Sequence, residues 1–260
     1  MAMSSQTFPA SQKALWAGRI ISALPALFLL VDGVLKLVKP PEVVTATVQL
    51  GYPESVIFGL GLVLVISTIL YLIPVTSIFG AMLLTGYLGG AVTTHVRIGE
   101  SPFSVIFPII IGLLLWFGLY LRVDRLRELV PRSTTAPPVS KIRLWVGRVI
   151  SGLLVLGMLF SGVMKLIKPT PVVDEFSRLG YPESAAFGIG LLEILCTIIY
   201  LIPGTATLGA ILLTAYLGGA VATHVRVGDP FIGPVVFGIL AWVGLFLRDD
   251  RFRHLIPLRS

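Results

Sequence analysis

The sequence predicts an all-α membrane protein that consists of two parallel-oriented repeats of a four-transmembrane-helix bundle, with eight transmembrane helices in all. Composition is the first reason: of the 260 residues, 55% are hydrophobic and 13% are charged, and the mean hydropathy is +0.94. Soluble domains carry about 25% charged residues to cover their surface. This composition excludes a soluble enzyme, a disordered chain and a nucleic-acid binder, despite a net charge of +7. The lipid bilayer is the expected partner.

Eight apolar segments are the second reason. Each has about 18–24 residues, which is enough for a helix to cross a hydrocarbon core of about 30 Å. Only helices and closed barrels satisfy their backbone groups in lipid, and strand alternation is absent. We expect the helices at roughly 15–38, 55–73, 75–96, 103–121, 144–167, 184–202, 204–225 and 230–247. Residues 42–50 are expected to form a short interfacial helix.

An internal duplication is the third reason. The sequence GYPES at residues 51–55 recurs at 180–184, and THVR at 94–97 recurs at 223–226, an offset of 129 residues. We therefore expect a tail (1–13), a first repeat (14–131), a linker (132–142) and a second repeat (143–257). Because each repeat has an even number of helices, both should face the same way and form an intramolecular pseudo-dimer.

Loop charges predict the orientation. Most of the 20 lysines and arginines fall on one side if the N-terminus is cytoplasmic, which predicts a multi-pass protein of the cell membrane with both termini in the cytoplasm. The first apolar segment lacks a small-residue cleavage site and is expected to be retained. The single cysteine, Cys196, excludes an intramolecular disulfide.

Two acidic residues lie deep in apolar segments. Asp32 belongs to the first helix of the first repeat, and Glu193 to the second helix of the second repeat. Their repeat counterparts are Ser161 and Leu64, so each repeat has one buried acid, supplied by a different helix. Such an acid costs about 2.5–3.5 kcal/mol on insertion scales, which makes it a candidate for a functional group.

Two lysines suggest partners for these acids. Asp32 and Lys36 are spaced i,i+4 on one helix face, and Lys165 is placed so that Glu193 can reach it from a neighbouring helix. We hypothesise one buried acid–lysine pair in each repeat. Two interpretations remain open at this point: the pairs only hold helices together, or they form a substrate, proton or quinone site.

Two histidines, His95 and His224, end the third helix of each repeat. A role at the helix end and a hydrogen bond to a quinone carbonyl are both open. A metal site is not expected because no second ligand lies near either histidine. No nucleophile, phosphate-loop or dinucleotide motif occurs, so no catalytic residues are assigned and autonomous catalysis is not expected. The small residues Gly86 and Gly90, with Ala215 and Gly219 as counterparts, are expected to pack helices closely.

Several segments carry a resemblance to a known family. The sequence LGYP at 50–53 recurs at 179–182, while GVLKLVKP at 33–40 and GGAVTTH at 89–95 have the close counterparts GVMKLIKP at 162–169 and GGAVATH at 218–224. The second repeat adds GLLE at 190–193. Both repeats resemble the DoxX-like family of small four-helix membrane proteins, and the first departs from it at Leu64, where that family usually has glutamate. The resemblance implies a bundle in the cytoplasmic membrane. The family takes its name from a subunit associated with thiosulfate:quinone oxidoreductase, and some relatives are linked to oxidative-stress complexes.

Three functions remain open from the sequence. The resemblance favours an accessory or quinone-interacting subunit of a membrane redox system, with redox subunits as partners and quinone as the one cofactor left open. The candidate site residues are then Asp32, Lys36, Lys165, Glu193, His95 and His224. A small-molecule or proton-coupled transporter would also explain tandem repeats with buried charges. A structural scaffold would explain the lack of catalytic motifs.

Overall fold

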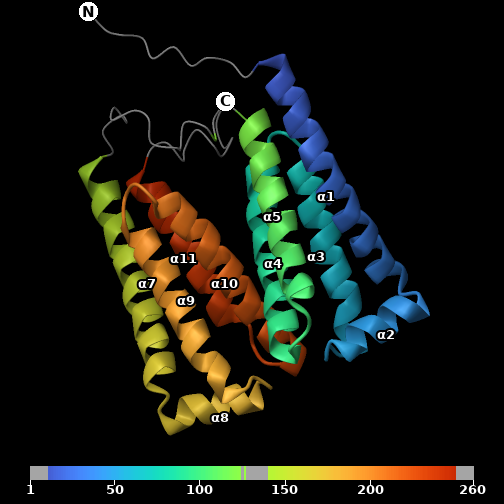
Figure 1. Ribbon diagram of the computed structural model, residues 1–260. Helices are drawn as coiled ribbons and strands as arrows, with labels where there is room; N and C mark the ends of the chain where they lie inside the picture. Colours follow the sequence, from blue (N-terminus) through green and yellow to red (C-terminus); the bar gives the residue numbers. More distant parts are fainter. Residues whose placement is uncertain (1–10, 124–125, 127–139, 250–260) are drawn as a thin grey trace, which may run out of the picture.

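The structure, a computed structural model, describes residues 11–123, 126 and 140–249, which form helices joined by short turns, with no strand among them (Figure 1). Most of the expected tail (1–13) and linker (132–142), and the end of the second repeat beyond residue 249, lie outside the described residues.

Five of the described helices form the first unit: α1 (Gln12–Val38), α2 (Pro41–Gln49), α3 (Glu54–Leu72), α4 (Ser77–Ile98) and α5 (Pro102–Arg122). Helix α1 packs against α3 and α5, and α4 packs against the same two helices from the other side, which closes a four-helix bundle. The short helix α2 lies across one end of this bundle (Figure 1).

The second unit repeats this plan with α7 (Lys141–Ile167), α8 (Thr170–Arg178), α9 (Glu183–Leu201), α10 (Ala206–Val227) and α11 (Ile232–Arg248). The short helices α2 and α8 lie at the same end of the molecule, here called the α2–α8 end (Figure 1). Seven of the described helices are long and apolar enough to cross a membrane, and α11, with 17 residues, is a shorter apolar helix.

All eight expected apolar segments are helices, with small differences at their ends. Helices α1 and α7 begin earlier than expected because Ser11 and Ser140 cap them: each hydroxyl accepts a hydrogen bond from a backbone N–H of the first turn. The expected short helix at 42–50 is confirmed as α2 and has a counterpart in α8, and both begin at a proline-containing first turn.

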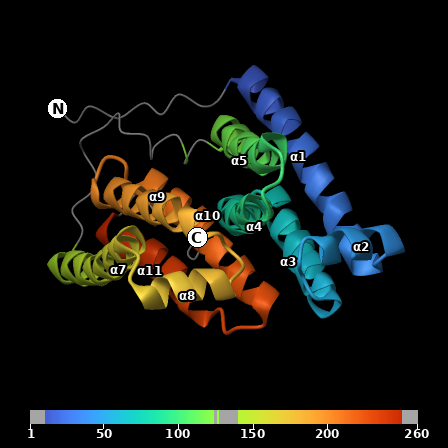
Figure 2. The ribbon, with the colours of Figure 1, turned by 60° about the horizontal axis from the view of Figure 1, so that its bottom comes forward.

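The two units meet where α4 packs against α10, side by side at the centre of the molecule (Figure 2). A Cβ atom added to Gly218 would lie 2.0 Å from the carbonyl oxygen of Gly86, and one added to Gly89 would lie 2.0 Å from that of Ala215. The backbones of the two helices are therefore in direct contact, which only glycine permits at these positions. The expected close packing of small residues is confirmed, and it joins one repeat to the other.

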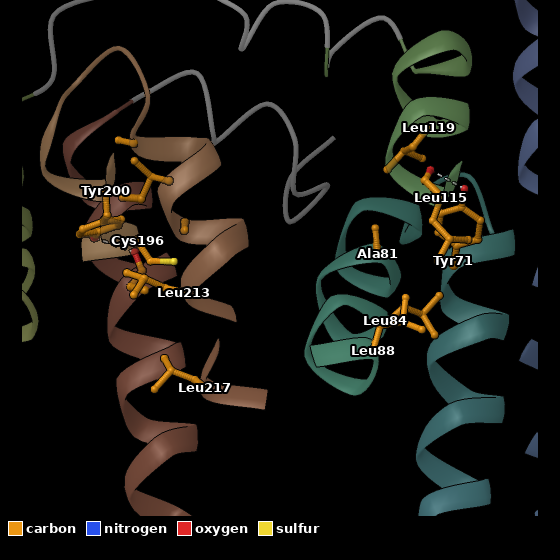
Figure 3. Packing of buried hydrophobic residues seen from close by; sticks show 14 of the residues in the cluster. Tyr71, Ala81, Leu84, Leu88, Leu115, Leu119, Cys196, Tyr200, Leu213 and Leu217 are labelled. Atoms are coloured by element: carbon orange, nitrogen blue, oxygen red, sulfur yellow. Dashed lines mark hydrogen bonds between the residues drawn. The ribbon is translucent and has the colours of Figure 1, made fainter. Parts of the chain in front are cut away.

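A buried tyrosine holds three helices together in each unit, at the end opposite α2 and α8. The Tyr71 hydroxyl donates a hydrogen bond to the carbonyl oxygen of Leu115 (2.8 Å) and is hydrogen-bonded to Ser22 Oγ (2.9 Å), which links α3 to α5 and α1. Tyr200 occupies the same place in the second unit (Figure 3). Cys196 is buried near Tyr200 as a small apolar side chain.

The α4–α10 contact predicts a strong effect of one added methyl group. Gly218→Ala should lower the melting temperature of the protein in mild detergent, because overpacking against backbone costs about 1–3 kcal/mol. Gly188→Ala on α9 is the matched control, since an added Cβ there meets nothing within 4 Å. The control should melt at or slightly above the wild-type temperature, because alanine favours helix over glycine by up to about 1 kcal/mol. Equal melting of Gly218→Ala and wild type would contradict the close approach.

Candidate functional site

The structure brings Lys165 of α7 and Glu193 of α9 together inside the second unit. Lys165 Nζ lies 2.8 Å from Glu193 Oε2 and donates a second hydrogen bond to Ser161 Oγ, at 2.5 Å. The Glu193 side chain is 2% exposed and that of Lys165 is 18% exposed. The pair hypothesised from the sequence therefore has the geometry of a charge-assisted hydrogen bond between two helices.

A tyrosine that the sequence analysis did not assign completes this cluster. The Tyr216 hydroxyl, on α10, donates a hydrogen bond to Glu193 Oε2 at 2.9 Å. The other carboxylate oxygen, Oε1, accepts no hydrogen bond from any residue that the structure describes. Removing either charged partner from such a buried pair would leave the other uncompensated, which is costly.

This cluster of Ser161, Lys165, Glu193 and Tyr216 lines a cavity of about 690 Å³. The walls come from both repeats: α4 and α5 of the first repeat contribute one side, with Val92 and Trp116 among its residues, and the second repeat contributes the rest. Most of the lining side chains are apolar. Phe176, Leu179 and Tyr181, from α8 and the turn after it, lie at the α2–α8 end of the cavity.

An ion-pair network fastens α8 in place over this cavity. The Arg178 guanidinium lies 2.7 Å from Glu175 Oε1 and 2.5 Å from Asp229 Oδ2, in the loop between α10 and α11. The hydrogen bonds from Arg178 lower the pKa of both carboxyl groups, and the two carboxylates raise the pKa of Arg178. The network belongs to the second repeat alone, since α2 has Gln49 and Ala46 where α8 has Arg178 and Glu175.

The first repeat has a different arrangement. Lys36 forms its ion pair with Asp32 on the same helix, and the Asp32 side chain is 33% exposed. Leu64, the counterpart of Glu193, is fully buried. Asp32 and Lys36 line a second cavity of about 1500 Å³ together with Tyr87, the counterpart of Tyr216. The two acid–lysine pairs thus face separate cavities and do not meet.

Each of the two histidines lines one of these cavities, near the α2–α8 end. His95 lines the larger cavity, and its Nδ1 lies 2.9 Å from Glu100 Oε2. His224 lines the smaller cavity, and its Nδ1 lies 3.6 Å from Asp229 Oδ2 without a hydrogen-bond partner in the described part of the chain. Each histidine therefore adds a polar group to the cavity of one acid–lysine pair.

The Lys165–Glu193 cluster can bind a neutral, mostly apolar ligand. An ammonium group has three N–H donors, and Lys165 uses two of them, on Ser161 and Glu193. The third donor and the unpaired Glu193 Oε1 can serve a ligand carbonyl and a ligand hydroxyl respectively. Because the pair is neutral as a whole, a neutral ligand leaves its charge balance unchanged.

Comparison with known proteins identifies one family. The family model described as DoxX-like matches residues 20–118 and 149–244, one match in each repeat. No curated protein and no solved structure matches the chain significantly.

The cross-helix pair predicts energetic coupling. Glu193→Gln and Lys165→Gln should each lower the unfolding free energy of the protein in detergent. The double variant should lose less unfolding free energy than the sum of the two single losses. Loss of one partner of a buried pair costs about 3–5 kcal/mol in soluble proteins. Contact pairs couple by about 0.5–3 kcal/mol, and a double-mutant cycle of unfolding free energies measures this.

The matched control is the same cycle on Asp32→Asn and Lys36→Gln. That pair lies within one helix and its acid is more exposed than Glu193, so its coupling should be about 0.5 kcal/mol or less. Additive effects of the two substitutions at Glu193 and Lys165 would contradict the pairing.

Proposed function

The chain belongs to the DoxX-like family and is a multi-pass membrane protein, and from this premise we propose that it is an accessory, quinone-binding subunit of a membrane redox system, without catalysis of its own. One observation carries the proposal: the Lys165–Glu193–Tyr216 cluster lines a mostly apolar cavity between the two repeats. Ligand sites are typically apolar cavities with a few polar groups that fix the ligand's orientation.

The residues of the smaller cavity fit a quinone head group. Its volume of about 690 Å³ lies within the range of about 300–1,000 Å³ that is usual for ligand sites. A quinone is an apolar ring with carbonyl oxygens that accept hydrogen bonds, and Lys165 has a donor to spare. A quinol has hydroxyl groups instead, and Glu193 Oε1 can accept from one of them. When bound, the quinone would carry electrons that a partner subunit supplies.

The membrane topology is part of the proposal. We infer eight crossings, α11 included: its 17 residues span about 25 Å, and it packs along α7 and α10. The two repeats cross in the same direction as an intramolecular pseudo-dimer, with α2 and α8 on the outer side and both termini in the cytoplasm of a cell-membrane protein. The excess of lysine and arginine on the other side supports this orientation.

Transport is the second candidate, and the larger cavity favours it. Asp32 is part-exposed in that cavity, and acidic residues within membrane helices often mark substrate or ion pathways. Transport would appear as a substrate or proton flux in proteoliposomes that Asp32→Asn abolishes. The accessory role expects no such flux.

Quinone content tests the proposal directly. Protein purified in mild detergent should carry quinone that organic extraction and chromatography detect, together with a copurifying redox subunit. A Lys165→Gln, Glu193→Gln double variant should lose most of the quinone, because the head group loses its charged hydrogen-bond partners, an effect of about tenfold or more in affinity.

The matched control for this experiment is an Asp32→Asn, Lys36→Gln double variant, which neutralises the pair that faces the other cavity. It should keep its quinone. Wild-type protein without quinone, or loss in the control alone, would overturn the assignment to the smaller cavity.

A further inference from the structure

Two arginines meet at the α2–α8 end of the molecule, outside both cavities. Arg97 lies in the last turn of α4 and Arg226 in the last turn of α10. They are repeat counterparts, and the contact between α4 and α10 places them next to each other. Both are half-buried.

The two Gly-Tyr-Pro turns surround this pair. A Cβ atom added to Gly51 would lie 3.0 Å from Arg97 Nη2 and 3.5 Å from Arg226 Cδ. One added to Gly180 would lie 3.7 Å from Arg226 Nη2 and 3.8 Å from Arg97 Nη1. Each turn therefore touches the arginines of both repeats, and a side chain at Gly51 would crowd the guanidinium of Arg97.

Each guanidinium is held by one backbone carbonyl. Arg97 Nη2 donates to the carbonyl oxygen of Leu50, at 2.6 Å, and Arg226 donates to that of Leu179 in the same way. A guanidinium has five N–H donors, so most of them are left for another partner. The carbonyls fix the position of the arginines without neutralising them.

No carboxylate among the described residues pairs with either arginine. The two nearest loops contribute Glu100 and Asp229, and these pair with His95 and Arg178 instead. The hydroxyls of Tyr52 and Tyr181 are bonded to Thr94 and Thr223.

The two tyrosines also supply no negative charge. Burial raises the pKa of both phenols, although Arg97 and Arg226 act in the opposite direction. The tyrosines are therefore neutral at pH 7, and two adjacent positive charges lack a counter-charge in the described part of the chain.

We propose that Arg97 and Arg226 together bind one oxyanion, a phosphate or carboxylate group, at the point where the two repeats meet. Adjacent guanidiniums bind such groups through paired hydrogen bonds, and the anion removes the repulsion between them. In a membrane, the anion is supplied either by the headgroup of an anionic phospholipid or by a free anion in water.

Two assays on the detergent-purified full-length protein distinguish these sources. In the first, inorganic phosphate is compared with chloride at equal ionic strength, and the melting temperature is followed. In the second, phosphatidylglycerol is compared with phosphatidylcholine, and retained lipid is counted by native mass spectrometry. A higher melting temperature in phosphate than in chloride indicates a free anion. Selective retention of phosphatidylglycerol, without a response to phosphate, indicates a lipid headgroup. Either result supports the site.

The variants decide whether the arginines are responsible. An Arg97→Gln, Arg226→Gln double variant should bind the anion about tenfold or more weakly, as expected for the loss of charged hydrogen bonds. A Lys39→Gln, Lys168→Gln double variant removes the same charge from the same end and should bind like wild type. If the arginine double variant fails to fold, either single variant should show the loss, because the anion needs both groups. No response of wild type to phosphate or phosphatidylglycerol, or an equal response of both double variants, overturns the proposal.

Discussion

The backbone contact between α4 and α10 is the constraint on which the other features depend. Gly89 and Gly218 let the two helices approach until backbone touches backbone. Because of this approach, α4 and α5 can supply part of the wall of a cavity whose polar cluster lies entirely in the second repeat. The same approach brings Arg97 beside Arg226. A pair of independent bundles would have neither feature.

Duplication has been followed by divergence in the charged residues, while the framework has stayed the same. Tyr71 and Tyr200 form equivalent hydrogen bonds, and Trp116 and Trp242 each donate to a threonine on the neighbouring helix. By contrast, the position of Glu193 is occupied by Leu64 in the first repeat, and the ion pairs of α8 have no equivalent in α2. The framework residues are thus shared by both halves, as are Arg97 and Arg226, whereas the acids that pair with Lys36 and Lys165 come from different helices in the two halves.

Much of the fold could be predicted from the sequence, because length, apolarity and proline positions determine the helices. The Lys165–Glu193 pair could be anticipated as well, since a buried charge requires a partner. The role of Tyr216 could not, because helices in lipid are apolar on all sides and no stripe shows which face turns inward. The meeting of Arg97 and Arg226 depends on contact between repeats, which repeat spacing alone does not give.

The different placement of the two acid–lysine pairs has a mechanical consequence. In the second half, the Lys165–Glu193 bond crosses from α7 to α9, so it resists any separation or sliding of these helices. In the first half, Asp32 and Lys36 both lie on α1, so their bond places no restraint on how α1 sits against α3. One half of the chain therefore has an ion pair between two helices, and the other half has its ion pair within one helix. Two identical subunits could not differ in this way, whereas a fused pair can.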